Sequence, residues 1–97
     1  MRLENSELRA FRAVIEEGDF RRAADALHIS QSAVSQAVAG LEFKLEAPLV
    51  QRGKELRLTD VGRRLFDHAV DVLLDEQQTL EDIVQLKQGK TETLSLA

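Results

Sequence analysis

The sequence predicts a mostly helical fold: three short helices, a small two-stranded hairpin, and then one long helix. Three observations predict it. Apolar residues recur at helical spacing in three segments before residue 46. Pro48 then ends the helical pattern, and two short segments of strand-like character follow. Beyond Thr59, apolar residues keep a seven-residue register from Phe66 to Val84, which predicts a long helix.

The first helix is expected to start near Asn5 and to end at Gly18, a residue that readily adopts the left-handed conformation of a helix stop. Asp19 is the expected N-cap of a second helix that follows at once. The inward stripes are Leu8, Phe11, Val14 and Ile15 in the first helix, and Phe20, Ala23, Ala24 and Leu27 in the second. The two alanines allow another helix to cross closely, as a helix-turn-helix requires.

The predicted turn between the second and third helices is only His28-Ile29-Ser30. Histidine tolerates positive φ better than most residues, so His28 is interpreted as a turn residue and not as a catalytic one. Ile29 is expected to fill a corner of the core, and Ser30 to cap the third helix.

The third helix, in SQSAVSQAVAGLEFKL from Ser30 to Leu45, is the most informative stretch. Its inward stripe is Val34, Val38, Leu41 and Leu45. The opposite face carries Gln31, Ser32, Ser35, Gln36 and Ala39, which are short and uncharged, and mostly hydrogen-bonding. An ordinary solvated face would carry more Lys and Glu, whereas a helix that touches base edges needs short donors and acceptors. We interpret this segment as a recognition helix.

The expected hairpin pairs residues 49–52 with residues 55–58 through a two-residue Gly53-Lys54 turn. Arg52 and Lys54 lie at its tip, with Arg57 nearby. These charges either protect a strand edge or contact DNA, and we favour DNA contact, with Arg52 in the minor groove.

Thr59 is the expected N-cap of the long helix, which is predicted to run to about Gln88 and to stop at Gly89. Its stripe cannot be buried along its whole length by so small a head, which implies a second copy of the helix and hence a dimer. The predicted dimer contacts are Phe66, Val70, Leu73, Gln77, Leu80 and Val84. The tail, with the strand-like Leu94-Ser95-Leu96, suggests the start of a missing domain. The expected division is therefore 1–58, 59–89 and 90–97.

Charge and composition limit the function. Residues 1–65 hold eleven Lys and Arg against ten Asp and Glu, a balance of +1, whereas residues 66–97 hold two against seven, a balance of −5. The chain has no cysteine and only two histidines, forty residues apart, so no metal site, nucleophile relay or other enzymatic constellation is expected. No signal peptide or membrane span is evident, which favours a cytoplasmic protein without membrane contact.

Residues 3–66 resemble the N-terminal DNA-binding domain of LysR-type transcriptional regulators, through LRAFRAVIEEGDFRRAADALHISQSAVSQAVAGLE, APLVQR and LRLTDVG. The resemblance implies a winged helix-turn-helix, a linker-helix homodimer, and binding to pseudo-palindromic double-stranded DNA. It implies base contacts by Gln31, Ser32, Ala33, Ser35 and Gln36, and backbone or wing contacts by Arg21, Arg22, Ser30, Arg52 and Lys54. No cofactor is implied for this fragment. A small-molecule effector is implied for the missing domain, and full-length members are often tetramers.

Four positions depart from the common family pattern. Ser32 stands where proline is usual, and Gln36 where arginine is frequent, which shifts the expected base preference from guanine toward adenine. Glu46 occupies a position that is often glycine, so the helix end is expected to close differently. Phe43 replaces a commonly charged residue, and an exposed aromatic there would suggest a contact with another chain.

The competing hypothesis is a winged helix that binds only proteins, which the net charge of −4 supports. The two hypotheses differ in where the arginines lie in space: a basic stripe beside the third helix favours DNA.

Overall fold

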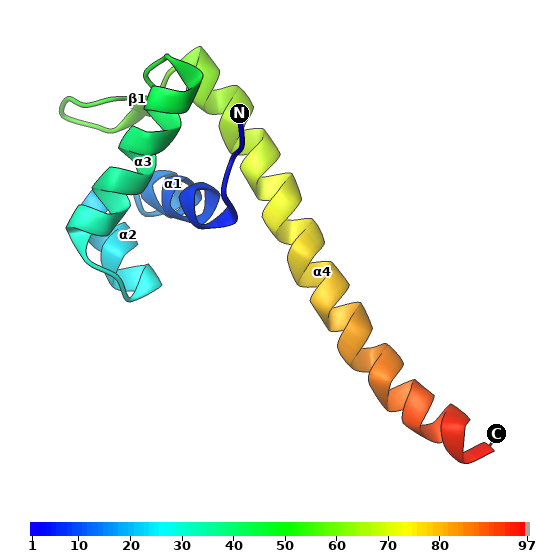
Figure 1. The fold of residues 1–97 in the computed structure, drawn as a ribbon. Coiled ribbons are helices and arrows are strands. Elements are labelled where there is room, and N and C mark those ends of the chain that lie inside the picture. The colour runs from blue at the N-terminus through cyan, green and yellow to red at the C-terminus, as the bar shows by residue number, and fades with distance from the viewer. Residues whose placement is uncertain (97) are drawn as a thin grey trace.

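The computed structural model describes residues 1–96 of the chain, with side chains described for residues 1–89. The described part contains α1 (Asn5–Glu17), α2 (Phe20–Leu27), α3 (Gln31–Leu45), β1 (Val50–Gln51), β2 (Arg57–Leu58) and α4 (Asp60–Leu96). Helices α1 to α3 form a head, the hairpin projects from one side of it, and α4 leaves it as a rod (Figure 1). This confirms the predicted fold class of a winged helix-turn-helix followed by a long helix. The three-part division of the chain stays a prediction.

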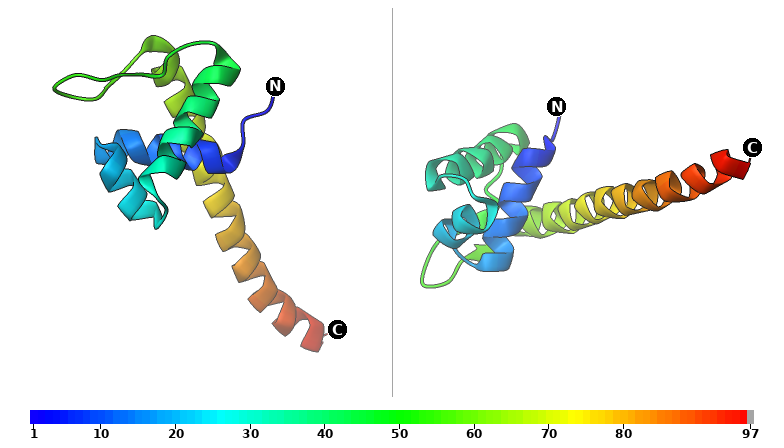
Figure 2. Two further views of the ribbon diagram at one scale, coloured as in Figure 1. Left: turned by 60° about the vertical axis from the view of Figure 1, so that its left-hand side comes forward. Right: turned by 90° about the horizontal axis from the view of Figure 1, so that it is seen from below.

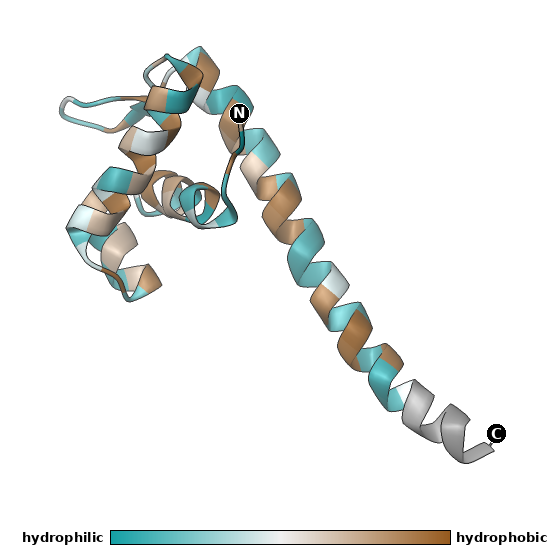
Figure 3. Ribbon diagram, viewed as in Figure 1, coloured by the Kyte–Doolittle hydropathy of each residue, from teal (hydrophilic) through white to brown (hydrophobic). Residues whose placement is uncertain are grey.

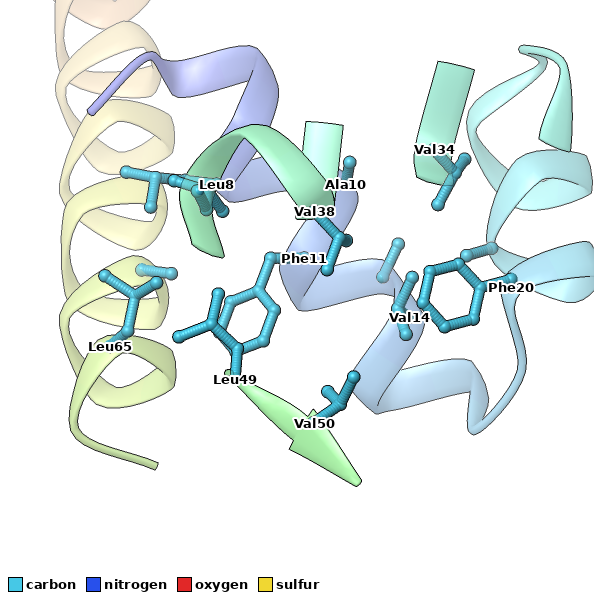
Figure 4. Close-up of a cluster of buried hydrophobic side chains, with 14 of the residues drawn as sticks. Leu8, Ala10, Phe11, Val14, Phe20, Val34, Val38, Leu49, Val50 and Leu65 are labelled. Atoms are coloured by element: carbon cyan, nitrogen blue, oxygen red, sulfur yellow. The ribbon is translucent and has the colours of Figure 1, made fainter. Parts of the chain in front are cut away.

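The core of the head forms where the predicted stripes of α1, α2 and α3 meet (Figure 4). Phe11 lies at the centre, fully buried, and its ring meets Phe66 of α4 edge to face at a centroid distance of 6.4 Å. Ala23 is completely buried, so its small side chain lets α2 pack closely, as predicted. The remaining buried core residues of the three helices are Leu8, Ala10, Ala13, Val14, Phe20, Ala24, Val34, Val38 and Leu41.

Two helices end on residues other than glycine in the left-handed conformation. His28 (φ 58°) closes α2 as predicted: its N–H donates to the Asp25 carbonyl and the N–H of Ile29 donates to the Ala24 carbonyl. Glu46 (φ 53°) closes α3 with the same pair of bonds, so this helix end has the usual closure although glycine is missing.

The expectation for Ile29 is wrong. Its side chain is 44% exposed and does not fill a corner of the core. The reason is that its backbone N–H completes the closure of α2, which places the residue outside the last helical turn. The caps flanking this region are confirmed: Gly18 ends α1 with φ 74°, the Asp19 carboxylate accepts from the Arg22 N–H, and the Ser30 hydroxyl accepts from the Ala33 N–H.

The predicted two-residue turn of the hairpin is also wrong. Val50 pairs with Leu58 and Gln51 with Arg57, which leaves a five-residue loop, 52–56. Gly53 does not have the positive φ that it would need as the first residue of the expected turn. In the expected register Val50 would oppose the charged Arg57. The observed register instead pairs it with Leu58, which also packs against the core.

The start of α4 is fixed closely against the head. The Thr59 hydroxyl accepts from the Gly62 N–H, confirming the predicted cap, and donates to the Pro48 carbonyl at 2.7 Å. A Cβ atom on Gly62 would overlap the carbonyl oxygen of Leu49, so only glycine fits where the helix crosses the chain before β1.

The predicted end of α4 at Gly89 is wrong, because the helix continues to Leu96. A single glycine costs only about 1 kcal/mol inside a helix, which neighbouring helix-favouring residues offset. The strand-like segment expected at Leu94-Ser95-Leu96 is therefore part of α4, and Ala97 lies outside the described residues. No helix in the described part of the chain is long and apolar enough to cross a membrane.

Candidate nucleic-acid interface

The outer face of α3 is polar, uncharged and unoccupied by the rest of the chain. Because Val34, Val38 and Leu41 turn inward to the core, the residues between them are directed away from it. The side chains of Gln31, Ser32, Ser35 and Gln36 line one shallow hollow on the surface. None of these four side chains makes a hydrogen bond within the described part of the protein, so their donors and acceptors are available to a partner.

Two other residues predicted to contact DNA, Ser30 and Ala33, do not belong to this group of four polar side chains with no hydrogen bond. Ser30 is exposed, but its hydroxyl oxygen is engaged as the N-cap acceptor for Ala33 at 3.1 Å. Ala33 is half-buried, as Ser35 is, but unlike Ser35 it does not line the hollow on α3. The structure therefore brings together the four polar residues of α3 more clearly than the full predicted set.

Cations flank the polar face of α3 from two elements. Arg21 and Arg22 are exposed in the first turn of α2. Arg52, Lys54 and Arg57 are exposed in the hairpin, hereafter the wing (residues 50–58), where they line a second shallow hollow. All views place α2, α3 and the wing on the part of the head away from the free length of α4 (Figure 2). This is the arrangement that distinguishes DNA binding from protein binding alone.

The same cations lack close carboxylate partners among the described residues. In the described part of the protein, ion pairs of 4.0 Å or less involve Arg2, Arg9, Arg12 and Lys44, all in the N-terminal segment, α1 or the last turn of α3. The arginines of α2 and the wing make none. These cations therefore form no close ion pair within the described residues, although the carboxylate of Glu55 lines the same hollow of the wing.

Arg52 has a contact of another kind. Its guanidinium lies over the ring of Phe20, with 4.4 Å between the Arg52 Cζ atom and the ring centroid. Phe20 is the first residue of α2, so this cation–π contact joins the wing to the start of the helix-turn-helix. Nothing in the sequence spacing indicates this pair, which is separated by the whole of α2 and α3.

The C-terminal end of α3, the proposed recognition helix, is fixed to α1 and to the N-terminal segment. The Lys44 ammonium contacts the Glu7 carboxylate at 2.6 Å and donates to the backbone carbonyl of Arg2 at 2.8 Å. Partial burial raises the pKa of Glu7. The hydrogen bond from Lys44, the bond from the Glu4 N–H and the Lys44 charge outweigh that effect, so its pKa lies below the ordinary value of 4.5. Glu7 thus holds α1 and α3 together as an anion.

Comparison with known proteins adds to this geometry. Residues 6–63 match the family described as "Bacterial regulatory helix-turn-helix protein, lysR family". The chain belongs to the LysR family. A probable RuBisCO transcriptional regulator from Cyanidioschyzon merolae is 40% identical over 87 residues, which are 86% of this chain and 29% of the relative. The regulator ArgP from Pseudomonas aeruginosa is 43% identical over 82 residues, 84% of this chain and 27% of ArgP.

Solved structures of LysR-family proteins have the same fold. The DBD of BenM, in its crystal structure with catB site 1 DNA, aligns with a TM-score of 0.80 and 32% identity. The alignment covers 86% of this chain and 94% of the BenM domain. The chain therefore spans little more than a quarter of the two regulators named above, but its alignment covers nearly all of the BenM domain that was crystallised with DNA.

The linker helix of this LysR-family chain divides the predicted dimer stripe into two parts. Phe66 is half-buried and packs on Phe11, and Leu73 is only 8% exposed, so the head covers part of the first side chain and nearly all of the second. The assignment of the six residues to a dimer contact stays a prediction, and contact with the head leaves less of Leu73 than of Phe66 for a second chain. Val70 is half-buried, and the exposed part of the predicted stripe comprises Gln77, Leu80 and Val84.

Two further contacts were not predicted. Glu76 of α4 accepts from Asn5 at 2.7 Å and from Arg9 at 3.1 Å, which fixes α4 against α1 beyond the apolar contact.

Phe43 is 85% exposed on α3, where the sequence singled it out as a departure from the family pattern. The described residues contain no cluster of His, Asp or Glu that could hold a metal ion.

Proposed function

We propose that this chain is the sequence-specific DNA-binding part of a LysR-type transcriptional regulator and that it binds a pseudo-palindromic promoter site as a homodimer. The observation that carries the proposal is the polar, unbonded outer face of α3 between two groups of cations that have no carboxylate partners. The family membership and the DNA-bound structure of the similar BenM domain support it.

The face of α3 suits contacts with base edges. Gln36 has an amide that can donate to and accept from the same base, a pairing that fits adenine, and the serines offer short donors and acceptors. A helix of α-helical diameter with short side chains fits the major groove of B-DNA. In this proposal Gln31, Ser32, Ser35 and Gln36 read the sequence, with Ala33 contributing apolar contact.

The flanking cations suit the phosphate backbone. Arg21 and Arg22 reach one side of the groove, and Arg52 and Lys54 of the wing reach the other side and the minor groove. Such contacts supply affinity and salt dependence without choosing a sequence. The excess of acidic over basic residues lies in residues 66–97, whereas residues 1–65 have a balance of +1, so the net charge of the chain gives little support to the alternative of a module that binds only proteins.

The exposed apolar side of α4 supports pairing with a second copy of the chain. Beyond the head, hydrophobic residues recur along the helix with nothing from the same chain to cover them (Figure 3). Leu80, Ile83 and Val84 are each about half exposed, and they continue the side of α4 that packs on the head. Pairing of two α4 helices would bury them and place two recognition helices on one duplex.

Most of the length of the two regulators named above lies outside the part that this chain matches. We expect no cofactor for the DNA-binding part, a small-molecule effector for a further domain, and dimers or tetramers of the longer protein. A DNA target implies action in the cytoplasm.

The proposal is tested by fluorescence anisotropy of the dimer on a pool of promoter duplexes at several salt concentrations. We expect tight binding to a subset of duplexes that weakens steeply with salt. No binding at low salt by a folded dimer would contradict the proposal and return the protein-only alternative.

Three variants separate the roles. Gln36→Ala is expected to relax the preference at one base pair, with a loss of about 1–3 kcal/mol of discrimination. Arg52→Ala is expected to weaken binding to all sequences and to reduce the salt slope by about 1. Arg12→Ala is the matched control for loss of one charge, because Arg12 pairs with Glu16 on α1 and lies away from α3's outer face. Equal behaviour of the two arginine variants would reject the wing contact.

A further inference from the structure

The wing is held to the head by very little regular structure. Its strands are two residues long, and its loop spans residues 52–56. Val50, Leu56 and Leu58 pack on the core and fix the base of the wing, whereas the exposed residues 52–55 need a further contact if their cations are to have a defined position. Arg52 is the first residue after β1 and makes such a contact, with its guanidinium 4.4 Å from the centre of the Phe20 ring.

Phe20 is well placed to act as an anchor. It is only 8% exposed and lies with Val14 in the core cluster (Figure 4), and it begins α2 directly after the Asp19 cap. The ring position is therefore set by the packing of the head. One face of a fixed ring can orient the cation that lies over it.

A stacked guanidinium differs from one in an ion pair. In an ion pair the carboxylate occupies the N–H donors and neutralises the charge, whereas stacking on a ring leaves the donors at the edge of the guanidinium plane free. Arg52 has no ion pair in the described part of the chain, although the sequence holds 17 acidic residues. The stack therefore orients Arg52 and keeps both its charge and its hydrogen-bond donors available.

We propose that Phe20 is a positioning residue for DNA binding: its ring pre-orients Arg52, so that the wing meets the DNA at a fixed place relative to α3. The inference rests on the proposed function. It assigns to Phe20 a role beyond its place in the core, and it makes the start of α2 part of the wing contact. Because Arg21 and Arg22 follow Phe20 directly, the same anchor relates the backbone contacts of α2 to those of the wing.

The first measurement does not need DNA. In the NMR spectrum of the DNA-free dimer, the Arg52 side-chain signals are expected to show an upfield ring-current shift. Phe20→Leu, which keeps an apolar side chain but removes the π face, should abolish the shift. Phe20→Tyr, which keeps the ring, should retain it. Arg52 signals that are unshifted in the parent would overturn the proposal whatever the protein binds.

The second measurement is a double-mutant cycle on a duplex bound by the parent. Phe20→Leu is expected to weaken binding about fivefold in the parent, corresponding to one exposed cation–π contact, and less than twofold in an Arg52→Ala background. Phe66→Leu is the matched control, because Phe66 also packs against the core but its ring meets Phe11 and not Arg52. Its effect on binding should be the same with and without Arg52.

The outcomes are distinct. Equal losses for Phe20→Leu in both backgrounds would mean that it acts through the general fold, and unchanged affinity would mean that the stack is not used; either overturns the positioning role. If the parent shows the ring-current shift but binds no duplex, the proposed function fails and the inference fails with it, while the stack itself stands.

Discussion

The head and the outer half of α4 differ in how their apolar stripes are covered. In the head, the stripes of α1, α2 and α3 bury one another, and Phe11, Val14, Val34 and Leu41 have no exposed surface. Along α4 past Glu76, Leu80, Ile83, Val84 and Leu86 are all substantially exposed. One continuous helix therefore has two environments: its first turns complete the core of one chain, and its later turns leave an apolar surface that the proposed second copy would cover.

The largest expected effect is on the free energy of unfolding, and it distinguishes a buried from an exposed phenylalanine. Phe11→Ala should lower the free energy of unfolding by about 3–5 kcal/mol, because it leaves a cavity at the centre of the head. Phe43→Ala is the matched control: this side chain is exposed, so a change within about 0.5 kcal/mol is expected. Urea unfolding followed by circular dichroism gives both values. A similar loss for the two variants would show that the head is not organised around Phe11.

The next effect concerns the outer half of α4. Leu80→Asp/Val84→Asp should raise the dimer dissociation constant by more than about tenfold, since two charges would be buried in the helix pairing. The head should stay folded, because neither residue touches its core. Gln85→Asp adds a charge on the other side of the helix and is the control. Analytical ultracentrifugation measures the association, and a double variant that dimerises like the control would reject this surface.

The smallest effect is a pH dependence within the head. The folded pKa of Glu7 lies below its ordinary value of 4.5, so its ion pair contributes stability above about pH 4.5 and loses it as the pH falls through the folded pKa. Glu7→Gln keeps an oxygen that can accept from the Glu4 N–H but removes the charge. We expect it to cost about 1 kcal/mol at pH 7 and progressively less as the pH falls from about 4.5 through the folded pKa of Glu7. Unfolding free energies measured across this range, with Glu16→Gln as the control on α1, would expose a pH-independent loss if the charge were irrelevant.

Sequence patterns predicted the parts of this molecule that depend on local chemistry. The spacing of apolar residues placed the three head helices and identified the outer face of α3, and the caps at Asp19, Ser30 and Thr59 follow from side chains that bond to nearby N–H groups. The left-handed His28 was also accessible, because the tolerance for that conformation belongs to the residue itself.

The errors arose where a distant part of the chain decides the outcome. The wing register depends on Val50 and Leu58 both packing on the head, which no local turn signal reveals. A seven-residue register identified the stripe of α4 but could not show that Phe66 packs on Phe11 of α1 or that Leu73 is buried within one chain. The stack of Arg52 on Phe20 likewise joins residues that are remote in sequence.

The tight seat of Gly62 against Leu49 has a mechanical consequence. With 37 residues, α4 is a lever about 55 Å long whose fulcrum is this contact. A tilt of about 5° at the fulcrum would displace its far end by about 5 Å, on the scale of one helical turn. The hydrogen bonds from Asn5 and Arg9 to Glu76 connect α1 to α4 partway along the helix and limit such tilting. Torque applied at the far end is therefore delivered to the head as a whole, recognition helix and wing together, instead of bending the joint between them.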